Sequence, residues 1–211
     1  MSVVPRLHVD PHHVRTEDLL PAVDIIRGGG IVAYPTDTLY GLAVDPRSSS
    51  AVHQVFVAKR RPQDRPIPLI AGDLSQVRAV ARLTPLAERL AGHGWPGPLT
   101  LVIPADPSLC REIHLGTGTV AVRIPDSVVA RCFAMAAGHA LTSTSANISG
   151  DEPVSSAEEV AATIGPALGL LIDGGPAPGG PPSTIVDVTG DEPVLIRAGA
   201  VAWDRVLRFL H

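Results

Sequence analysis

The chain has few aromatic residues, few cysteines and no long apolar segment. Aromatic residues make up 3% of its 211 residues, so the core has to be built from aliphatic side chains. The two cysteines, Cys110 and Cys132, form neither a CxxC pair nor a metal-binding spacing, which indicates a reduced, cytoplasmic protein. Glycine, proline or histidine interrupts every apolar run before it is long enough to span a bilayer. We therefore expect no membrane contact, and residues 1–13 do not predict a signal peptide.

The sequence also lacks the basic field and the motifs of several large functional classes. Its net charge of −4 argues against electrostatic wrapping of nucleic acid, although it does not exclude a local basic pocket. There is no GxxxxGK[ST] loop, and the glycines at 28–30 precede an expected strand instead of following one, which excludes a dinucleotide-binding fingerprint. No GxSxG, Cys/His pair or paired-carboxylate pattern supports hydrolase chemistry.

The histidines near the N-terminus do not predict a metal site. His8, His12 and His13 lie close together in the sequence, but no cysteine or glutamate stands at a recognisable ligand spacing. A mobile tail is the better interpretation. We expect no protein-held metal ion.

What is present indicates one α/β domain. Hydrophobic residues make up 45% of the chain and charged residues 18%, typical of a globular protein. Periodicity and capping residues predict helices over 16–27, 48–59, 84–92, 127–137, 156–164 and 203–210. Strands are expected over 31–34, 66–71, 99–103, 119–124, 168–172, 184–188 and 194–196, and a short apolar segment over 140–143. Some neighbouring strands lack a crossover helix, which favours a twisted mixed parallel and antiparallel sheet flanked by helices.

The domain organisation follows from the same pattern. Residues 1–15 are expected to be an N-terminal extension, and residues 16–211 a single catalytic domain. The glycine- and proline-rich run at 174–182 is expected to be a loop inside that domain, because strands are expected on both sides of it.

Two segments carry hydroxyl groups at strand ends, where binding residues are common. The first is YPTDTLYGL at 34–42, and the second is TSTSANISG at 142–150. Hydroxyl and amide groups suit a small polar ligand or phosphate oxygens. Each segment taken alone is better explained as a turn or a helix cap.

The segment KRRP at 59–62 is the densest positive charge in the chain. In a regular helix Lys59 and Arg61 would point to nearly opposite sides. The proline at 62 biases the residue before it toward an extended backbone, in which residues two apart point the same way. Lys59 and Arg61 could then converge on a polyphosphate, and neither is expected in the core. An ordinary helix C-terminus with its cations is an equally good explanation of this segment alone.

A fourth segment runs from the glycines at 174–175 to Ser183, with Arg197 further along. Its glycine content permits close approach of the backbone to a ligand. The alternative is a surface Ω-loop with a solvated arginine.

In order along the chain, these segments resemble the YrdC family, whose members include threonylcarbamoyl-AMP synthases. The matching motifs are YPTDTLYGLA at 34–43, KRRP at 59–62, WPGPLTLV at 95–102, VAVRIPD at 120–126, TSTSANISG at 142–150, IDGGP at 172–176, STIVDVTG at 183–190 and LIRAG at 195–199. Any one motif is weak, but together they cover most of the chain. The resemblance implies a mixed α/β fold with a large concave cavity.

The resemblance also implies roles for particular residues. Lys59 and Arg61 would be the catalytic residues and hold the ATP phosphates. ATP binding would further involve Thr144, Ser145, Asn147, Ser183 and Arg197. Threonine and bicarbonate would be held by Thr36, Tyr40, Arg123 and Thr142, with Arg123 pairing with the threonine carboxylate.

The implied reaction is an adenylation. Bicarbonate and the amine of L-threonine give a carbamate, which attacks the α-phosphate of ATP. Pyrophosphate then leaves with the help of Mg²⁺ carried by ATP. The product would pass to a separate threonylcarbamoyl transferase complex that makes N6-threonylcarbamoyladenosine at adenosine 37 of tRNA. The protein would contribute by positioning the substrates and neutralising their charge, and no covalent protein nucleophile is required.

Two alternatives from the same fold stay open. One is a double-stranded RNA- or tRNA-binding module without adenylation activity, against which the negative net charge counts. The other is a relative that makes a different carbamoyl adenylate, as in hydrogenase maturation. No accessory domain of that system is expected on the chain, which counts against this alternative.

The chain departs from the family pattern at four positions, and it is expected to lack the C-terminal domain of longer relatives. Ile70 stands where some relatives have a threonine-binding histidine, and Pro68 occupies an expected strand. Ala198 and Pro182 replace other residues beside Arg197 and Ser183. These differences concern the threonine pocket more than the nucleotide site.

Overall fold

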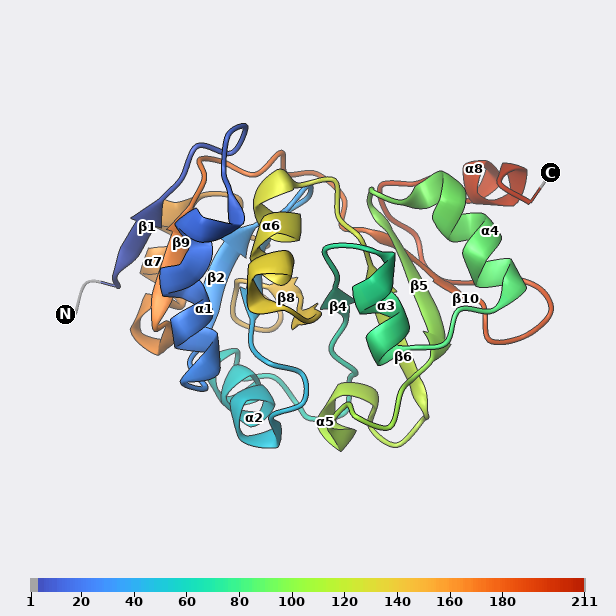
Figure 1. Ribbon diagram of the computed structural model, residues 1–211, viewed down its shortest axis with the longest axis horizontal. Coiled ribbons are helices and arrows are strands. Elements are labelled where there is room, and N and C mark those ends of the chain that lie inside the picture. The colour runs from blue at the N-terminus through green and yellow to red at the C-terminus, as the bar shows by residue number, and fades with distance from the viewer. Residues whose placement is uncertain (1–3, 211) are drawn as a thin grey trace.

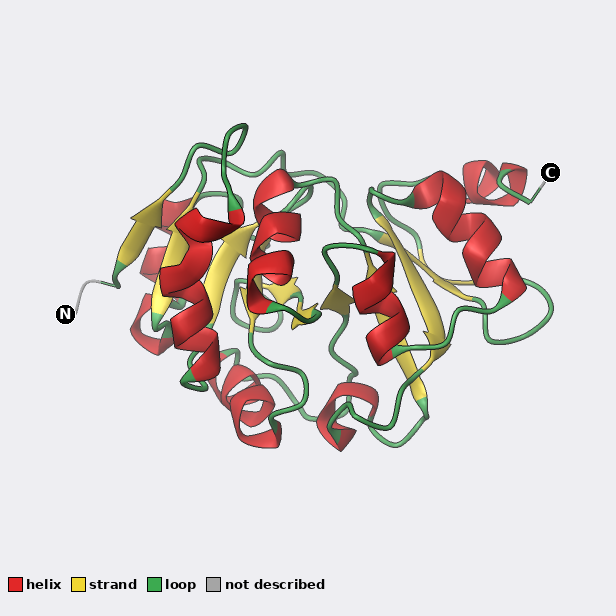
Figure 2. Ribbon diagram, viewed as in Figure 1, coloured by secondary structure: helices red, strands yellow, loops and turns green. Residues whose placement is uncertain are grey.

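The computed structural model describes residues 4–210, which form two mixed β-sheets with helices packed around them (Figures 1 and 2). The first sheet has five strands in the order β1-β9-β2-β3-β8, and the second has six in the order β11-β10-β5-β6-β4-β7. Parallel and antiparallel pairs occur in both sheets. The predicted α/β class with a mixed sheet is confirmed, but the strands divide between two sheets.

The centre of the five-stranded sheet is a hairpin. Strands β2 (Val32–Pro35) and β3 (Tyr40–Ala43) pair antiparallel, and every residue of both is buried. Strand β9 (Leu170–Asp173) runs parallel to β2 on the other side. The loop between β2 and β3 contains the threonines of the first hydroxyl-rich segment, so the hairpin places them at one edge of the sheet.

Strand β1 (Arg6–His8) corrects the expected N-terminal extension. It pairs in parallel with β9 and forms an edge of the five-stranded sheet. Nδ1 of His8 lies 3.3 Å from Asp173 of β9, and Nη1 of Arg6 lies 2.9 Å from Glu158. These residues therefore belong to the domain and do not form a mobile tail.

The six-stranded sheet is built around β5 (Leu99–Pro104). β5 pairs antiparallel with β6 (Thr119–Arg123) and parallel with β10 (Thr184–Asp187), and β11 (Val194–Arg197) forms an edge beside β10. On the other side, β4 (Leu69–Ile70) runs parallel to β6. Only these two residues of the expected strand at 66–71 are in a strand.

The chain crosses between the two sheets at residues 141–145. Strand β7 (Leu141–Thr142) pairs with β4 in the six-stranded sheet, and β8 (Thr144–Ser145) pairs with β3 in the five-stranded sheet. The hydroxyl of Thr142 accepts a hydrogen bond from the amide of Val44 at 2.9 Å and donates to the carbonyl of Leu42 at 3.0 Å. This short segment therefore joins the two sheets, with Ser143 between them.

Four of the predicted helices begin at a capping side chain, whereas the sequence did not predict the helices at 74–80, 111–114 and 165–167. The side chains of Ser48, Thr84, Ser127 and Ser156 each accept a hydrogen bond from a backbone amide in the first turn. The helices are η1 (Thr16–Leu19), α1 (Leu20–Arg27), α2 (Ser49–Ala58), α3 (Leu74–Val80), α4 (Pro85–Gly94), α5 (Arg111–His114), α6 (Val128–Ala137), α7 (Ala157–Thr163), η2 (Gly165–Ala167) and α8 (Trp203–Arg208). Within residues 4–210, no helix is both long and apolar enough to cross a membrane.

The core consists of two clusters, as the aliphatic composition requires. The larger one runs from the β2–β3 hairpin through α2 to the six-stranded sheet. The smaller one packs α1 and α6 on the five-stranded sheet, and the two helices lie side by side in Figure 1. In this second cluster the rings of Tyr34 and Phe133 meet edge to face, with centroids 5.6 Å apart. Ile70 and Leu141 join it from the other sheet, so α6 contacts both sheets.

Gly199 provides a test of the packing at the end of β11. A Cβ atom there would lie 2.2 Å from the carbonyl oxygen of Pro182 and 2.6 Å from backbone atoms of Ser183 and Thr184. Because backbone atoms cannot swing away as a side chain can, we expect Gly199→Ala to lower the free energy of unfolding by about 2 kcal/mol or more, measured by urea denaturation. Gly190→Ala is the matched control, since no atom lies within 4 Å of its Cβ position. Equal stability of both variants would contradict this packing.

Candidate active site

A cavity of about 410 Å³ lies between the two sheets. Its walls come from the β2–β3 loop, β3 and β8 on one side and from β5, β6, β10 and β11 on the other. All but two of the residues predicted for the site line it: Thr36, Tyr40, Arg61, Arg123, Thr144, Ser145, Asn147, Ser183 and Arg197. The exceptions are Lys59 and Thr142.

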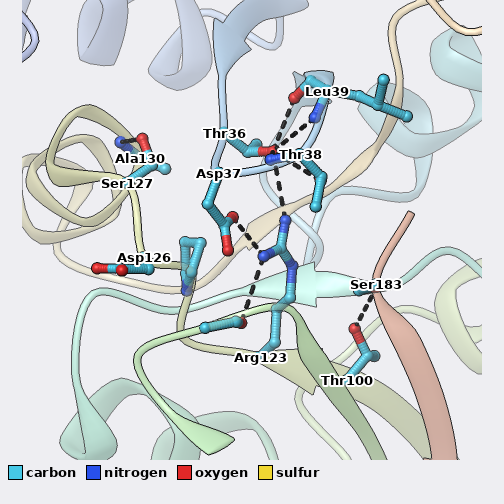
Figure 3. Close-up of polar contacts among 12 residues, drawn as sticks. Thr36, Asp37, Thr38, Leu39, Thr100, Arg123, Asp126, Ser127, Ala130 and Ser183 are labelled. Carbon is cyan, nitrogen blue, oxygen red and sulfur yellow. Dashed lines mark hydrogen bonds and ion pairs between the residues drawn. The ribbon is translucent and has the colours of Figure 1, made fainter. Parts of the chain in front are cut away.

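Arg123, the last residue of β6, forms a buried ion pair with Asp37. Nη1 lies 2.5 Å from Oδ1 of Asp37, and the two side chains are only 7% and 9% exposed. The same nitrogen donates to the carbonyl of Gly97 at 3.4 Å, and Nη2 donates to the hydroxyl of Thr36 at 3.4 Å. Figure 3 shows these contacts converging on the guanidinium group. Arg123 is therefore fixed in place before any ligand binds.

The other carboxylate oxygen of Asp37 is buried and has no hydrogen-bond partner among the described residues. A buried charge of this kind is tolerated when an opposite charge lies beside it, and Arg123 is that partner. In Figure 3 the Thr100–Ser183 pair lies on the other side of Arg123 from Asp37. The arginine is thus held from one side, and Thr100 and Ser183 belong to the cavity wall on the other.

The β2–β3 loop is both a turn and part of the cavity. The hydroxyl of Thr36 accepts from the amides of Thr38 and Leu39 and donates to the carbonyl of Leu39 at 2.7 Å. The structural explanation of this segment, a turn closed by a side-chain hydroxyl, is therefore confirmed. Thr36, Thr38 and Leu39 of the same turn also line the cavity.

Tyr40 holds the opposite loop. Its hydroxyl donates to the carbonyl of Gly175 at 2.7 Å, which ties β3 to the glycine-rich segment after β9. Burial raises the pKa of Tyr40, and the nearby charge of Asp173 raises it further. The phenol therefore stays protonated at neutral pH and keeps a lone pair for a ligand.

Arg61 lies on the cavity wall without a carboxylate partner in the described part of the chain. Nη1 donates to the hydroxyl of Thr144 at 3.3 Å, and Nη2 donates to the carbonyl of Pro66 at 3.0 Å. Its Nε is buried and unpaired among the described residues. Burial lowers the pKa of Arg61, and the positive charge of Arg65 contributes in the same direction. Such a partly buried guanidinium is well suited to an anion.

The structure places Lys59 differently from the prediction. The segment is not extended: α2 ends at Ala58, Lys59 is still helical, and Arg60 takes a left-handed conformation with φ 50°. Lys59 is 2% exposed and therefore buried, against the expectation that it lies outside the core. Its Nζ donates to the carbonyls of Ser145 and Asn147, and Lys59 is not among the residues that line the cavity. Only Arg61 of the pair lines the cavity.

The far end of the cavity combines β5, β10 and β11. Nη2 of Arg197 donates to the carbonyl oxygen of Ser183 at 2.7 Å and to its hydroxyl at 3.2 Å. The hydroxyls of Ser183 and Thr100 are 2.8 Å apart. Burial lowers the pKa of Arg197, and the charge of Arg123 lowers it further. Ser183 and Arg197, far apart in the sequence, are therefore one unit.

Thr142 is a structural residue, which corrects its predicted role in ligand binding. It is fully buried, and its hydroxyl is used by the backbone of residues 42 and 44. Its neighbour Ser143 lines the cavity instead. Sequence reasoning also missed Asp37 and Thr100, although both lie inside motifs that were singled out. Their polar side chains could have identified them in the sequence, because a carboxylate or hydroxyl next to a buried strand needs a hydrogen-bond partner.

The unusual residues of the threonine pocket have distinct positions. Ile70 is fully buried in the second core cluster and is not among the residues that line the cavity. Pro68 and Leu69 line the cavity in its place, and Pro182 lines the opposite part. Ala198 is exposed. The cavity surface at this point is therefore apolar.

Comparisons with known proteins give a consistent result. The family model Sua5_yciO_yrdC, described as telomere recombination, matches residues 24–199. The Bacillus subtilis protein named threonylcarbamoyl-AMP synthase is 34% identical over 187 residues, which cover 88% of this chain and 54% of that protein. The Vibrio cholerae protein of the same name is 37% identical over 161 residues, which cover 75% of this chain and 86% of the relative.

A solved structure matches almost the whole chain. The crystal structure of Pyrococcus abyssi Sua5 complexed with L-threonine has a TM-score of 0.91 and 34% sequence identity. The match covers 99% of this chain and 61% of the other. This chain thus spans about half the length of the Bacillus subtilis relative and less than two thirds of the solved one.

The buried ion pair can be tested by a double-mutant cycle. Arg123→Met leaves the carboxylate of Asp37 buried without a partner, so we expect the free energy of unfolding to fall by about 3 kcal/mol. Asp37→Asn should cost about 1 kcal/mol, and the double variant should lose at least about 1 kcal/mol less than the sum. Urea denaturation gives all three values.

Arg197→Met is the matched control for this cycle, because the hydrogen-bond acceptors of Arg197 are uncharged. It removes a cavity arginine without leaving a carboxylate unpaired. Combined with Asp37→Asn it should be additive. Additivity of Arg123→Met with Asp37→Asn would show that the pair is not energetically coupled.

Proposed function

Because this chain belongs to the Sua5/YciO/YrdC family, we propose that it is an L-threonylcarbamoyladenylate synthase, a nucleotidyltransferase. It joins L-threonine, bicarbonate and ATP to give threonylcarbamoyl-AMP and pyrophosphate. The observation that supports this most is the single cavity on whose walls Arg61, Arg123 and Arg197 lie on different elements. Such a site is suited to a ligand with several negative groups, which ATP and an amino acid carboxylate together provide.

The threonine is placed at Arg123. The carboxylate pairs with the guanidinium group, which Asp37, Gly97 and Thr36 already hold. An arginine fixed before binding loses little freedom when a ligand arrives, so more of the interaction energy appears as affinity. The apolar wall of Pro68 and Leu69 suits the methyl group of threonine better than a charged side chain.

The ATP is placed across the rest of the cavity. Arg61 carries the positive charge for the phosphates, with Thr144, Ser145 and Asn147 beside it. Ser183 and Arg197 take the nucleoside end. Mg²⁺ enters with ATP as part of the substrate.

The chemistry needs orientation more than a reactive side chain. The amine of threonine attacks bicarbonate and forms an N–C bond, and water leaves to give the carbamate. A carbamate oxygen then attacks the α-phosphorus, and the bond to pyrophosphate breaks. Arg61 neutralises the charge that develops on the phosphates, and Tyr40 lies where its hydroxyl oxygen can accept a hydrogen bond from the carbamate N–H.

The product is a reactive mixed anhydride, so it needs a consumer. We propose that a separate threonylcarbamoyl transferase complex uses it to modify adenosine in tRNA in the cytoplasm. Direct RNA binding by this chain is a weaker alternative, because Arg123 is buried, Arg61 is half-buried and the net charge is −4.

The reaction is tested by pyrophosphate release. Release should require ATP, L-threonine and bicarbonate together, and mass spectrometry should detect threonylcarbamoyl-AMP. Arg61→Met should lower kcat/KM for ATP about 10- to 100-fold, because a charged hydrogen-bonding group is worth about 1.5–3 kcal/mol. Arg60→Met is the matched control: it removes the same charge from the exposed neighbour and should leave kcat/KM within about 2-fold.

Two outcomes would contradict the proposal. Pyrophosphate release without threonine would show that the amino acid assignment is wrong. RNA binding with a steep salt dependence and no adenylate would favour the RNA-binding alternative.

A further inference from the structure

Lys59 is the only lysine in the chain. The 17 basic residues comprise 16 arginines and this one lysine. Arginine therefore serves at every other basic position, including the three that line the cavity. The exception requires a reason at that position, and the surroundings of Nζ supply one.

Three oxygen atoms of one loop converge on Nζ of Lys59. They are the carbonyl oxygen of Ser145, the carbonyl oxygen of Asn147 at 2.6 Å, and the side-chain oxygen of Asn147 at 3.5 Å. An ammonium group is compact and has three donors, whereas a guanidinium group is a wide planar fork. Three acceptors around one point therefore match lysine and not arginine.

The backbone of Lys59 is tied to the same loop. Its carbonyl oxygen accepts a hydrogen bond from the amide of Ser149 at 2.8 Å. Within the loop, the hydroxyl of Ser145 donates to Oδ1 of Asn147 at 2.5 Å, and Nδ2 of Asn147 donates to the carbonyl of Asp151 at 2.7 Å. Lys59 thus closes a network that fixes residues 145–151 from behind.

Among residues 4–210, Lys59 has no carboxylate partner within salt-bridge distance, and the hydrogen-bond acceptors of its Nζ are oxygens of this loop. Burial, together with the nearby positive charge of Arg61, lowers the pKa of Lys59 to about 8. A buried cation without a counter-ion is costly, and it is unusual in a group that serves structure alone. Its donors are already used, and the residue does not line the cavity.

We propose that Lys59 is a positioning residue. Its ammonium group holds the 145–149 loop in the conformation that brings Ser145 and Asn147 to the cavity. Lys59 therefore affects the nucleotide through this loop and does not contact the nucleotide itself. The consequence for ATP rests on the proposed function. The state of the loop in the ligand-free protein does not, so the two can fail separately.

The first test uses the wild-type protein and its single lysine. Lys59 and the α-amino group are the only amines that acetic anhydride or a succinimidyl ester can acylate at pH 8, and mass spectrometry of peptides distinguishes these two sites from each other and from acylated tyrosine or cysteine. We expect Lys59 to react at least about 10-fold more slowly than in the urea-unfolded protein, with less than a 2-fold change on adding MgATP. Fast acylation that MgATP suppresses 10-fold would show a lysine open to the cavity and overturn the proposal.

The second test compares variants by hydrogen exchange without ligand. In Lys59→Met, amides of residues 143–150 should exchange at least about 10-fold faster than in the wild type. In Arg60→Met, which removes the exposed neighbouring cation, they should be unchanged. Lys59→Arg should restore the charge but not the protection, because its fork does not match the three acceptors.

The outcomes separate the two proposals. Unchanged exchange in Lys59→Met together with a loss of ATP affinity equal to that of Arg61→Met would mean direct contact with the nucleotide. If Lys59→Met unfolds, which far-UV circular dichroism detects, the acylation experiment decides. If no adenylate forms under any condition, the proposed function fails while loop protection and acylation still judge the role of Lys59.

Discussion

The fold depends on a chain segment that has to belong to two sheets at once. Residues 141–142 pair with β4, and residues 144–145 pair with β3. A single residue, Ser143, separates the two pairings, so the sheets must approach each other closely at this point. The hydroxyl of Thr142 adds hydrogen bonds to the backbone of residues 42 and 44 at the same point. The cavity lies beside this junction, and Ser143, Thr144 and Ser145 of the junction line it together with Asn147.

The electrostatics of the cavity follow from how its cations are held. Arg61 and Arg197 are held by carbonyl and hydroxyl oxygens, and Lys59 by carbonyl and amide oxygens. These acceptors orient a cation without cancelling its charge, so the field in the cavity stays positive. Arg123 is different, because Asp37 neutralises it. The cavity is therefore not uniformly basic: it has a balanced end at Arg123 and a charged end at Arg61. The two proposed ligands differ in the same way: an amino acid carboxylate carries one negative charge, whereas a polyphosphate carries several and suits the more positive end at Arg61.

The sequence predicted most elements because their local signals agree with the tertiary structure. Helix caps at Ser48, Thr84 and Ser127 were readable, since a capping side chain acts within four residues. The division into two sheets was not readable, because it depends on pairing between strands far apart, and β7 and β8 have only two residues each. Strand β1 was missed for the same reason: its pairing with β9 is visible only in three dimensions. The site residues were found by their resemblance to a family, and the motifs alone supported turns equally well.

The segment at 59–62 shows where local reasoning fails. The expected extended backbone would have placed Lys59 and Arg61 on one side, but Arg60 adopts a left-handed conformation that costs a non-glycine residue about 1 kcal/mol. That turn separates the two side chains, so that one enters the cavity wall and the other passes behind the loop at 145–149. The cost is offset by contacts that no local pattern contains, above all those of Nζ with residues 86 and 88 positions away in the sequence. A basic pair beside a proline therefore predicts that one of the two cations binds a ligand. Which of them lines the cavity depends on the distant loop at 145–149.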